Sequence, residues 1–261
     1  MEKGNTIPGE ALASHDAQAV NFREICAGSI APKTLYRSSH PIKDNKQERV
    51  IAPLAAQARI ATVINLCDNN SELPVKALLA PWYNKLYKNN RIIALGMGFS
   101  NTSEEFRRKL KKGLQFIINT EGAWLIHCHA GVDRTGFFSL ALEALMGATV
   151  DEIVNDYLQS FNSIFDSSIH SEVKKNDSLV VMRLLSVMGD YVEISDENLQ
   201  AIAENYFRKT IGLPAEEVEL LKSRLSGVVP MQIKICTALP RTGPRCGNAQ
   251  ASDGGSCRWG S

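Results

Sequence analysis

The sequence lacks an apolar run long enough to span a membrane, because its longest runs, residues 137–146 and 178–188, are short and interrupted. It also lacks the apolar core of a secretory signal near its start, so we expect a reducing, cytoplasmic setting for its cysteines. No pair among the six cysteines has Cys-x2-Cys spacing, which disfavours a zinc site. A net charge of +1 offers no bulk attraction for nucleic acid or for a membrane surface.

The composition is that of a globular protein, with 261 residues of which 44% are hydrophobic and 22% charged. A chain of this length can bury a core without disulfides or structural metals. We expect residues 1–20 to form a flexible leader and residues 228–261, which are rich in small and polar residues, to form a low-complexity tail. The folded domain is therefore predicted to span residues 21–227.

Within that domain, short β-branched runs alternate with amphipathic segments. The pattern predicts strands at residues 34–38, 60–66, 91–95 and 123–127. It predicts helices at 47–57, 74–88, 103–119, 135–146, 149–158, 178–188, 196–209 and 214–225. This order indicates an α/β fold with a mostly parallel central sheet flanked by helices, with extra C-terminal helices packed on it. Ligands in such folds bind beyond the carboxyl ends of the strands.

One stretch at such a strand end carries a recognisable chemistry: Ile126-His127-Cys128-His129-Ala130-Gly131-Val132-Asp133-Arg134-Thr135-Gly136. A Cys-x5-Arg pair alone arises easily by chance. Here, however, the cysteine ends a predicted strand, the arginine opens a predicted helix, and glycines stand where the backbone must bend. A tight loop of this kind turns successive N–H groups toward one point at a helix N-terminus, which is a binding site for phosphate.

The residue types in the loop suggest their roles. Arg134 offers a planar fork for two phosphate oxygens. The positive field of the loop favours the thiolate of Cys128, which can attack phosphorus and form a phosphocysteine. Thr135 is placed to donate its hydroxyl to the departing sulfur, and His127 is expected to brace the loop; no metal or cofactor is needed. Six residues are predicted to bind the phosphate: His129, Ala130, Gly131, Val132, Asp133 and Arg134.

The pattern His-Cys-x2-Gly-x-Asp-Arg-Thr-Gly resembles the signature loop of the protein tyrosine phosphatase superfamily. Its Asp-Arg-Thr-Gly ending resembles a bacterial tyrosine/dual-specificity branch. Residues 21–23 (Asn-Phe-Arg), 35–38 (Leu-Tyr-Arg-Ser) and 63–72 are similar to other segments of that branch. The resemblance implies a cysteine-dependent phosphatase that acts on phosphotyrosine, on mixed phosphoproteins or on small phosphomonoesters.

The general acid is not evident from the sequence. Many members of the superfamily use an aspartate upstream of the signature loop, but residues 96–102 contain none. Asp68 follows the second predicted strand and is either this acid or a turn residue. Asp133 lies within the loop and is either the acid or an acceptor for nearby N–H groups. Glu104 and Glu105 begin a helix, where carboxylates usually offset the helix dipole.

Rival functions remain open at this stage. A phosphoinositide or inositol phosphate is the alternative substrate, although Val132 stands where loops selective for such headgroups often have lysine. A phosphate-binding module with little turnover is the alternative of another class. Sulfurtransferases and arsenate reductases fit less well, because they use shorter loops or additional resolving cysteines.

Three residues outside the loop allow two interpretations each. Arg23 either supports the active-site loops or forms a structural ion pair, and we expect the ion pair. Arg37 either forms such a pair or supports the active-site loops. Cys67 is expected to be a small buried side chain, and a disulfide between Cys67 and Cys128 would require that the two lie close together.

Overall fold

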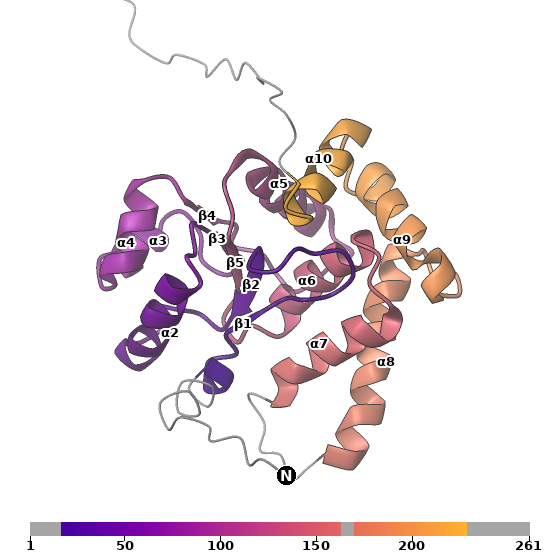
Figure 1. The fold of residues 1–261 in the computed structure, drawn as a ribbon, viewed down its shortest axis with the longest axis horizontal. Helices are drawn as coiled ribbons and strands as arrows, with labels where there is room; N and C mark the ends of the chain where they lie inside the picture. Colours follow the sequence, from indigo (N-terminus) through magenta and orange to yellow (C-terminus); the bar gives the residue numbers. More distant parts are fainter. Residues whose placement is uncertain (1–16, 163–169, 229–261) are drawn as a thin grey trace, which may run out of the picture. The chain divides into compact units, whose positions relative to one another are not determined.

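The computed structural model describes residues 17–162 and 170–228 (Figure 1). Apart from Val228, the predicted tail, residues 228–261, lies outside the described residues, as does most of the predicted leader, residues 1–20. Where the described chain begins, Val20 is already buried, and its carbonyl accepts hydrogen bonds from the backbone and the hydroxyl of Ser39. All described residues belong to one compact unit that ends at Pro230.

A five-stranded sheet with the order β1-β2-β5-β3-β4 forms the centre of this unit. The strands are β1 (Arg23–Glu24), β2 (Leu35–Ser38), β3 (Thr62–Asn65), β4 (Ile92–Ala94) and β5 (Trp124–His127). Only β1, which pairs with β2, is antiparallel. The mostly parallel sheet is thereby confirmed, and β1 is an addition that two residues are too few to signal in the sequence. Because β5 is central, the chain that leaves its carboxyl end has strand neighbours on both sides.

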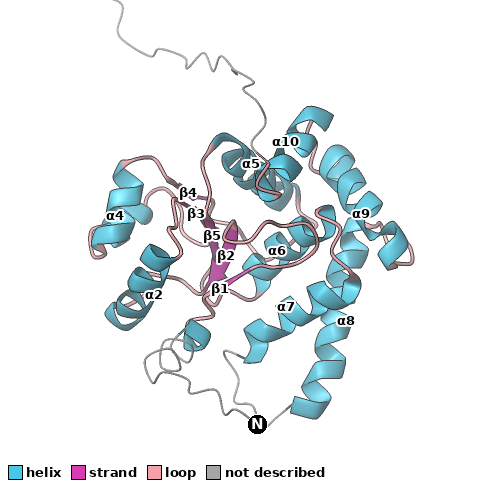
Figure 2. Cartoon of the chain, in the orientation of Figure 1, coloured by secondary structure: helices cyan, strands magenta, loops and turns pink. Residues whose placement is uncertain are grey.

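Helices cover both faces of the sheet (Figures 1 and 2). In the sheet, Val63 and Leu125 pack into one core cluster, while Ile64 and Ile126 pack into the other. This alternation follows from the two-residue period of a strand. The helices are α2 (Asn45–Gln57), α3 (Leu73–Ala77), α4 (Pro81–Lys88), α5 (Glu104–Asn119), α6 (Asp133–Leu145), α7 (Val150–Asn162), α8 (His170–Met188), α9 (Asp196–Asn205) and α10 (Ala215–Leu225), with a π-turn, η2 (Tyr206–Thr210), after α9.

The predicted helix at residues 74–88 is two helices, α3 and α4, joined by a short turn. Pro81 is the first residue of α4, a position where its missing N–H and fixed φ do no harm. The extra C-terminal helices are present as predicted, although α8 begins at His170 rather than at residue 178. Within the described ranges, no helix combines the length and the apolar character that crossing a bilayer requires.

Candidate active site

The loop predicted to bind phosphate connects the carboxyl end of β5 to the start of α6. We call residues 128–134 the Cys128 loop. Cys128 is buried, and the backbone N–H of Gly131 donates a hydrogen bond to its Sγ at 3.2 Å. Helix α6 is buried along almost its whole length, so its N-terminus is held firmly beneath the loop. The sulfur therefore lies where both a backbone donor and a helix N-terminus favour a negative charge.

The carbonyl group of Gly131 is held away from the interior of the loop. It accepts hydrogen bonds from Asn21 Nδ2 at 3.1 Å and from Arg37 Nη2 at 2.9 Å. The C=O and N–H of a trans peptide point in opposite directions. The N–H of Val132, which belongs to the same peptide group, therefore points away from the Gly131 carbonyl. Within the described chain this N–H has no protein acceptor.

The same arrangement recurs at His129, whose carbonyl accepts from the backbone N–H of His40 at 3.1 Å. The N–H of Ala130 is thereby turned away, and it too has no acceptor among the described residues. Gly131 has φ +77°, and a Cβ there would lie 2.5 Å from the carbonyl oxygen of Ser38. Only glycine allows the loop to approach the end of β2 this closely.

Arg134 faces the segment 96–102 that precedes α5. Its Nη1 donates to the carbonyl of Met97 at 2.9 Å, and its guanidinium lies 4.5 Å from the centre of the Phe99 ring. Its Nε is buried and has no partner in the described part of the chain. A buried donor without a partner is costly, and a phosphate oxygen could satisfy it.

Two carboxyl groups behind the loop, that of the buried Glu143 and that of the partly buried Asp156, were not recognised from the sequence. Asp156 of α7 accepts from Arg23 Nε at 2.9 Å and from Arg37 Nη1. Burial opposes the ionisation of Asp156, but the positive charges of Arg37 and Arg23 outweigh it and lower the pKa of the carboxyl. Burial and the neighbouring Asp156 charge raise the pKa of Glu143 well above its ordinary value, so Glu143 carries a proton and hydrogen-bonds to Asp156.

We call Arg23, Arg37, Glu143 and Asp156 the buried ion network. Arg37 is both a member of an ion pair and a support of the Cys128 loop, so its two interpretations hold together. The sequence held one signal that Glu143 is buried, since it is the only charged residue within the apolar run 137–146. Asp156 lies at an ordinary polar position of an amphipathic helix, so the sequence offered no signal for it.

Asp68 lies at the carboxyl end of β3, where its carboxylate is an acceptor for three donors. These are His40 Nε2 at 2.9 Å, Asn65 Nδ2 at 2.8 Å and Lys76 Nζ at 2.5 Å. Burial raises the pKa of Asp68, but these hydrogen bonds outweigh it and hold the pKa well below its ordinary value. The group is therefore ionised near neutral pH.

The other carboxyl candidates are more accessible. Asp133 is exposed in the first turn of α6, and within the described residues its side chain has no hydrogen bond or ion pair. Glu105 pairs with Lys109 at 2.6 Å, and Glu104 is exposed in the first turn of α5. Of these carboxyl groups, only that of Asp133 belongs to the Cys128 loop.

Thr135 lies directly after the loop and is buried. Its hydroxyl has no hydrogen-bond partner in the described part of the chain, so it does not donate to the sulfur in this conformation. Cys26, Cys67 and Cys128 are all free thiols.

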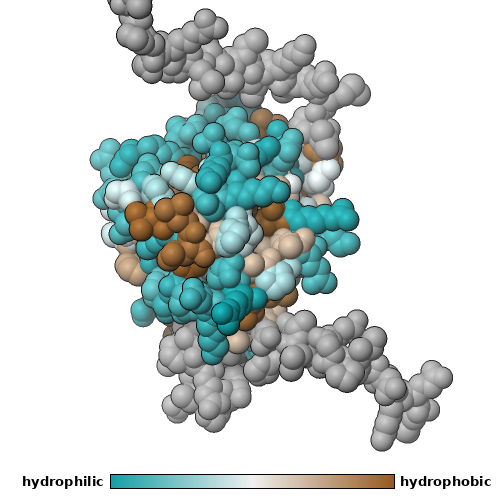
Figure 3. Space-filling model, turned by 90° about the vertical axis from the view of Figure 1, so that its left-hand side faces the viewer, coloured by the Kyte–Doolittle hydropathy of each residue, from teal (hydrophilic) through white to brown (hydrophobic). Residues whose placement is uncertain are grey.

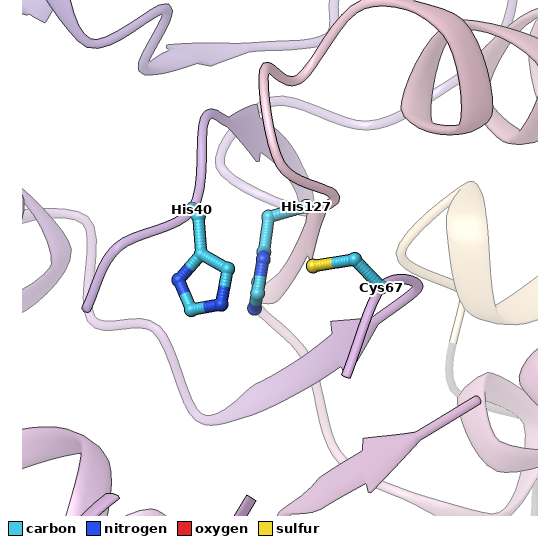
Figure 4. Close-up of side chains that lie close together, drawn as sticks. All are labelled: His40, Cys67 and His127. Carbon is cyan, nitrogen blue, oxygen red and sulfur yellow. The ribbon is translucent and has the colours of Figure 1, made fainter. Parts of the chain in front are cut away.

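Figure 4 shows His40, Cys67 and His127 together, with the His127 ring between the His40 ring and the sulfur of Cys67. Their ligand atoms lie within 4.8 Å of one another, which makes them a group among the described residues that could hold a metal ion. However, Nε2 of His40 is hydrogen-bonded to Asp68, and Nε2 of His127 is 2.9 Å from the Tyr83 hydroxyl. A metal would have to replace these bonds, so we regard the cluster as a polar support of the site.

The pKa shifts of His127 and Cys67 favour the neutral forms of both side chains. Burial, and then the proximity of His40, lower the pKa of His127 well below its ordinary value. Burial and the charges of Asp68 and Cys128 raise the pKa of Cys67 to about 12. Cys67 is therefore a thiol near neutral pH and a weak nucleophile.

A cavity of about 710 Å³ lies at the amino ends of the strands, among residues that include Tyr36, Arg59 and Gly122. No residue of the Cys128 loop lines it. Its lining residues include neither a thiol nor a helix N-terminus.

Comparisons with known proteins identify the family of the chain. The profile of the tyrosine phosphatase family matches residues 16–227, which is more than half of the chain. A Cupriavidus necator protein named for tyrosine-protein phosphatase activity (H16_A0669) is 33% identical over 94 residues, a match that spans 33% of this chain and 34% of the relative.

Two solved structures are also similar. The core catalytic domain of the PP-IP phosphatase SIW14 from S. cerevisiae, in complex with citrate, has 20% identity and a TM-score of 0.37, over 61% of this chain and 94% of that chain. A second structure of the Siw14 catalytic core has 19% identity and a TM-score of 0.36 over the same shares. From the match to the family profile, the chain belongs to the tyrosine phosphatase family.

Proposed function

We propose that the protein is a cysteine-dependent phosphomonoester hydrolase, of the tyrosine or dual-specificity type, that works through a phosphocysteine intermediate. The observation that carries the proposal is the Cys128 loop itself. Its sulfur accepts a backbone hydrogen bond from Gly131, while the N–H groups of Ala130 and Val132 have no protein acceptor among the described residues. Such a set of donors at a helix N-terminus suits a phosphate dianion.

In the first step, the Cys128 thiolate attacks phosphorus, so that a P–S bond forms while the bond to the ester oxygen breaks. Arg134 exchanges the Met97 carbonyl for two phosphate oxygens. The leaving oxygen takes a proton, for which we propose Asp133, because this carboxyl is exposed beside the loop and has no partner in the described chain. Asp68 suits this role less well, since its three donors keep it ionised and it has no proton to give.

In the second step, water attacks the phosphocysteine, the P–S bond breaks and the thiolate leaves. Asp133, now ionised, accepts a proton from the water. The Thr135 hydroxyl, which has no partner in the described residues, can turn to donate to the sulfur as negative charge returns to it. The products are inorganic phosphate and the free thiolate, so the cycle needs neither a metal nor a redox partner.

The test is turnover of p-nitrophenyl phosphate by the wild type and by Cys128→Ser, Arg134→Lys and Cys26→Ser. We expect no turnover by Cys128→Ser, and a loss of about 100-fold or more for Arg134→Lys, which keeps the charge but not the fork. Cys26→Ser is the matched control, because Cys26 is an exposed free thiol. If the wild type hydrolyses the substrate no faster than Cys128→Ser does, the proposed enzyme activity is wrong. The alternative, a phosphate-binding module with little turnover, would then remain.

A phosphorylated inositol, free or in a lipid, is a second candidate substrate. The pKa of His129 is lowered by partial burial and then by the charge of Lys43, with Lys76 also contributing. Basic side chains thus lie close to the Cys128 loop, although Val132 itself is apolar. Phosphate release from a phosphotyrosyl peptide, compared with release from inositol phosphates at equal concentration, distinguishes the two classes.

A further inference from the structure

Large apolar side chains are exposed on α3 and the turn that follows it. The exposed fractions are 68% for Val75, 68% for Leu78 and 73% for Leu79. Residues spaced i, i+3 and i+4 lie on one side of a helical turn. Figure 3 shows a hydrophobic patch surrounded by hydrophilic residues on the side of the molecule that carries α3 and α4. We call Val75, Leu78 and Leu79 the α3 face.

The chain around the α3 face has an unusual charge distribution. Residues 73–103 contain no aspartate or glutamate, although the whole chain has 28 acidic residues. The same segment contains Lys76, Lys85, Lys88 and Arg91. Lys85 and Lys88 of α4 are exposed, and neither has an ion pair in the described part of the chain. A local positive charge therefore accompanies the exposed apolar residues, even though the net charge of the chain is only +1.

The α3 face lies at the edge of the sheet that carries the Cys128 loop. Lys76 of α3 reaches Asp68 at the carboxyl end of β3. The backbone N–H of Gly96 donates to the carbonyl of Asp68 at 2.7 Å, which joins the segment 96–102 to the chain leading into α3. That segment carries Phe99, which is 70% exposed and lies over Arg134.

We propose that the α3 face docks on the surface of an anionic lipid bilayer. Val75, Leu78 and Leu79 enter the boundary between headgroups and acyl chains, while Lys85 and Lys88 contact lipid phosphates. Exposed apolar side chains with basic side chains nearby are what binding to an anionic membrane surface requires, and the one exposed acid beside α3, Glu72, precedes its first residue. Docking in this way brings the Cys128 loop close to phosphates presented at the membrane.

A second copy of the chain fits this surface less well. In a two-fold symmetric dimer the same patch faces itself, so the lysines of one copy would approach those of the other. Like charges brought together in this way oppose association. Three apolar side chains on one short helix are also fewer than the 20 to 30 residues, roughly, that each side of a stable protein interface contributes.

Co-sedimentation with vesicles tests the proposal. We expect the wild type to bind vesicles of phosphatidylcholine mixed with phosphatidylglycerol, and not phosphatidylcholine alone. Leu78→Ser/Leu79→Ser should lower the partition coefficient about tenfold or more, because two exposed leucines no longer leave water. The matched control is Tyr191→Ser/Val192→Ser, since these residues are 76% and 52% exposed on the turn after α8.

The charge contribution is tested separately. Lys85→Glu/Lys88→Glu should weaken binding about fivefold or more per lysine, and high salt should weaken the binding of the wild type. The control is Arg208→Glu/Lys209→Glu, which reverses two exposed charges on η2. Equal losses in the variant and its control would overturn the proposal, as would an absence of wild-type binding to anionic vesicles.

Two further measurements separate this proposal from others. If ultracentrifugation shows a dimer that Leu78→Ser/Leu79→Ser dissociates, while vesicle binding is unchanged, the face is a self-interface and the proposal is wrong. Hydrolysis of p-nitrophenyl phosphate by this variant should equal that of the wild type, because neither leucine touches the Cys128 loop. Since the vesicle assay measures binding alone, its result does not depend on whether the proposed hydrolase activity is found.

Discussion

Replacement of Asp156 by asparagine should destabilise the fold more than any change to an exposed acid. Asp156 is the common partner of Arg23 and Arg37, and the side chain of Arg37 is fully buried. Burial and the adjacent Arg37 already lower the pKa of Arg23 to about 10, which indicates that the two cations repel each other. Without the carboxylate, the buried charge of Arg37 and the partly buried charge of Arg23 would remain with only neutral acceptors.

The expected loss can be worked out from this geometry. Removing one partner of a buried ion pair costs about 3 to 5 kcal/mol, because the remaining charge is left without compensation. For a domain of this size, each kcal/mol corresponds to about 2 to 4 °C in Tm. The variant should therefore unfold about 6 to 20 °C below the wild type. Turnover should fall as well, because Arg37 also holds the carbonyl of Gly131.

Thermal unfolding followed by circular dichroism measures this loss, with phosphate release from p-nitrophenyl phosphate assayed well below the lower Tm. The matched control is Asp151→Asn, an exposed acid in the first turn of the same helix. We expect Asp151→Asn to change Tm by no more than about 2 °C. A Tm for Asp156→Asn within that range, with turnover intact, would refute the role that we assign to the buried ion network.

Three other predictions concern the loop and its acids. Asp133→Asn should lower kcat about 100-fold more for phenyl phosphate than for p-nitrophenyl phosphate, because only the poorer leaving group depends on the proton. Asp68→Asn should lower kcat for the two substrates by the same factor. If instead Asp68→Asn discriminates between the substrates and Asp133→Asn does not, Asp68 is the acid. Gly131→Ala should abolish turnover and lower stability by about 1 to 3 kcal/mol, since its Cβ would meet the Ser38 backbone at 2.5 Å with φ +77°; urea unfolding and turnover close to wild type would contradict this close approach. The pKa of Glu143 is raised in the native state, so the native state keeps a proton that the unfolded state releases from about pH 4 upward. The free energy of unfolding that this proton contributes is therefore present at lower pH and is lost as the pH rises through the folded pKa. Glu143→Gln cannot ionise and should lack that part of the pH dependence in unfolding measured from pH 5 to 9, whereas identical slopes would show that Glu143 is already ionised.

The parts of the molecule that the sequence predicted well are those encoded by neighbouring residues. Four strands were predicted because β-branched runs mark buried strands, and all four are present. The chain from Cys128 to Arg134 was predicted to connect a strand to a helix, and it does so between β5 and α6; its binding of phosphate stays a prediction. The single helix predicted at residues 74–88 was wrong, because α3 ends at Ala77 and Pro81 begins α4.

Other features of the site depend on residues that the chain brings together from far apart. Asp156 meets Arg37 across 119 positions, because β2 lies beside β5 and α7 packs against α6. Asp68 could be recognised as a candidate acid, but not as the acceptor of three hydrogen bonds, because His40 and Lys76 approach it from separate segments.

The sequence by itself was enough to predict a site at Cys128 and Arg134, since both belong to one short loop between a strand and a helix. The tertiary structure decided how that loop is supported and in which direction the pKa values of Asp68 and Glu143 are shifted. The physical reason is that burial and the charges of distant neighbours set the ionisation of a carboxyl group, and the sequence specifies these only through the complete fold.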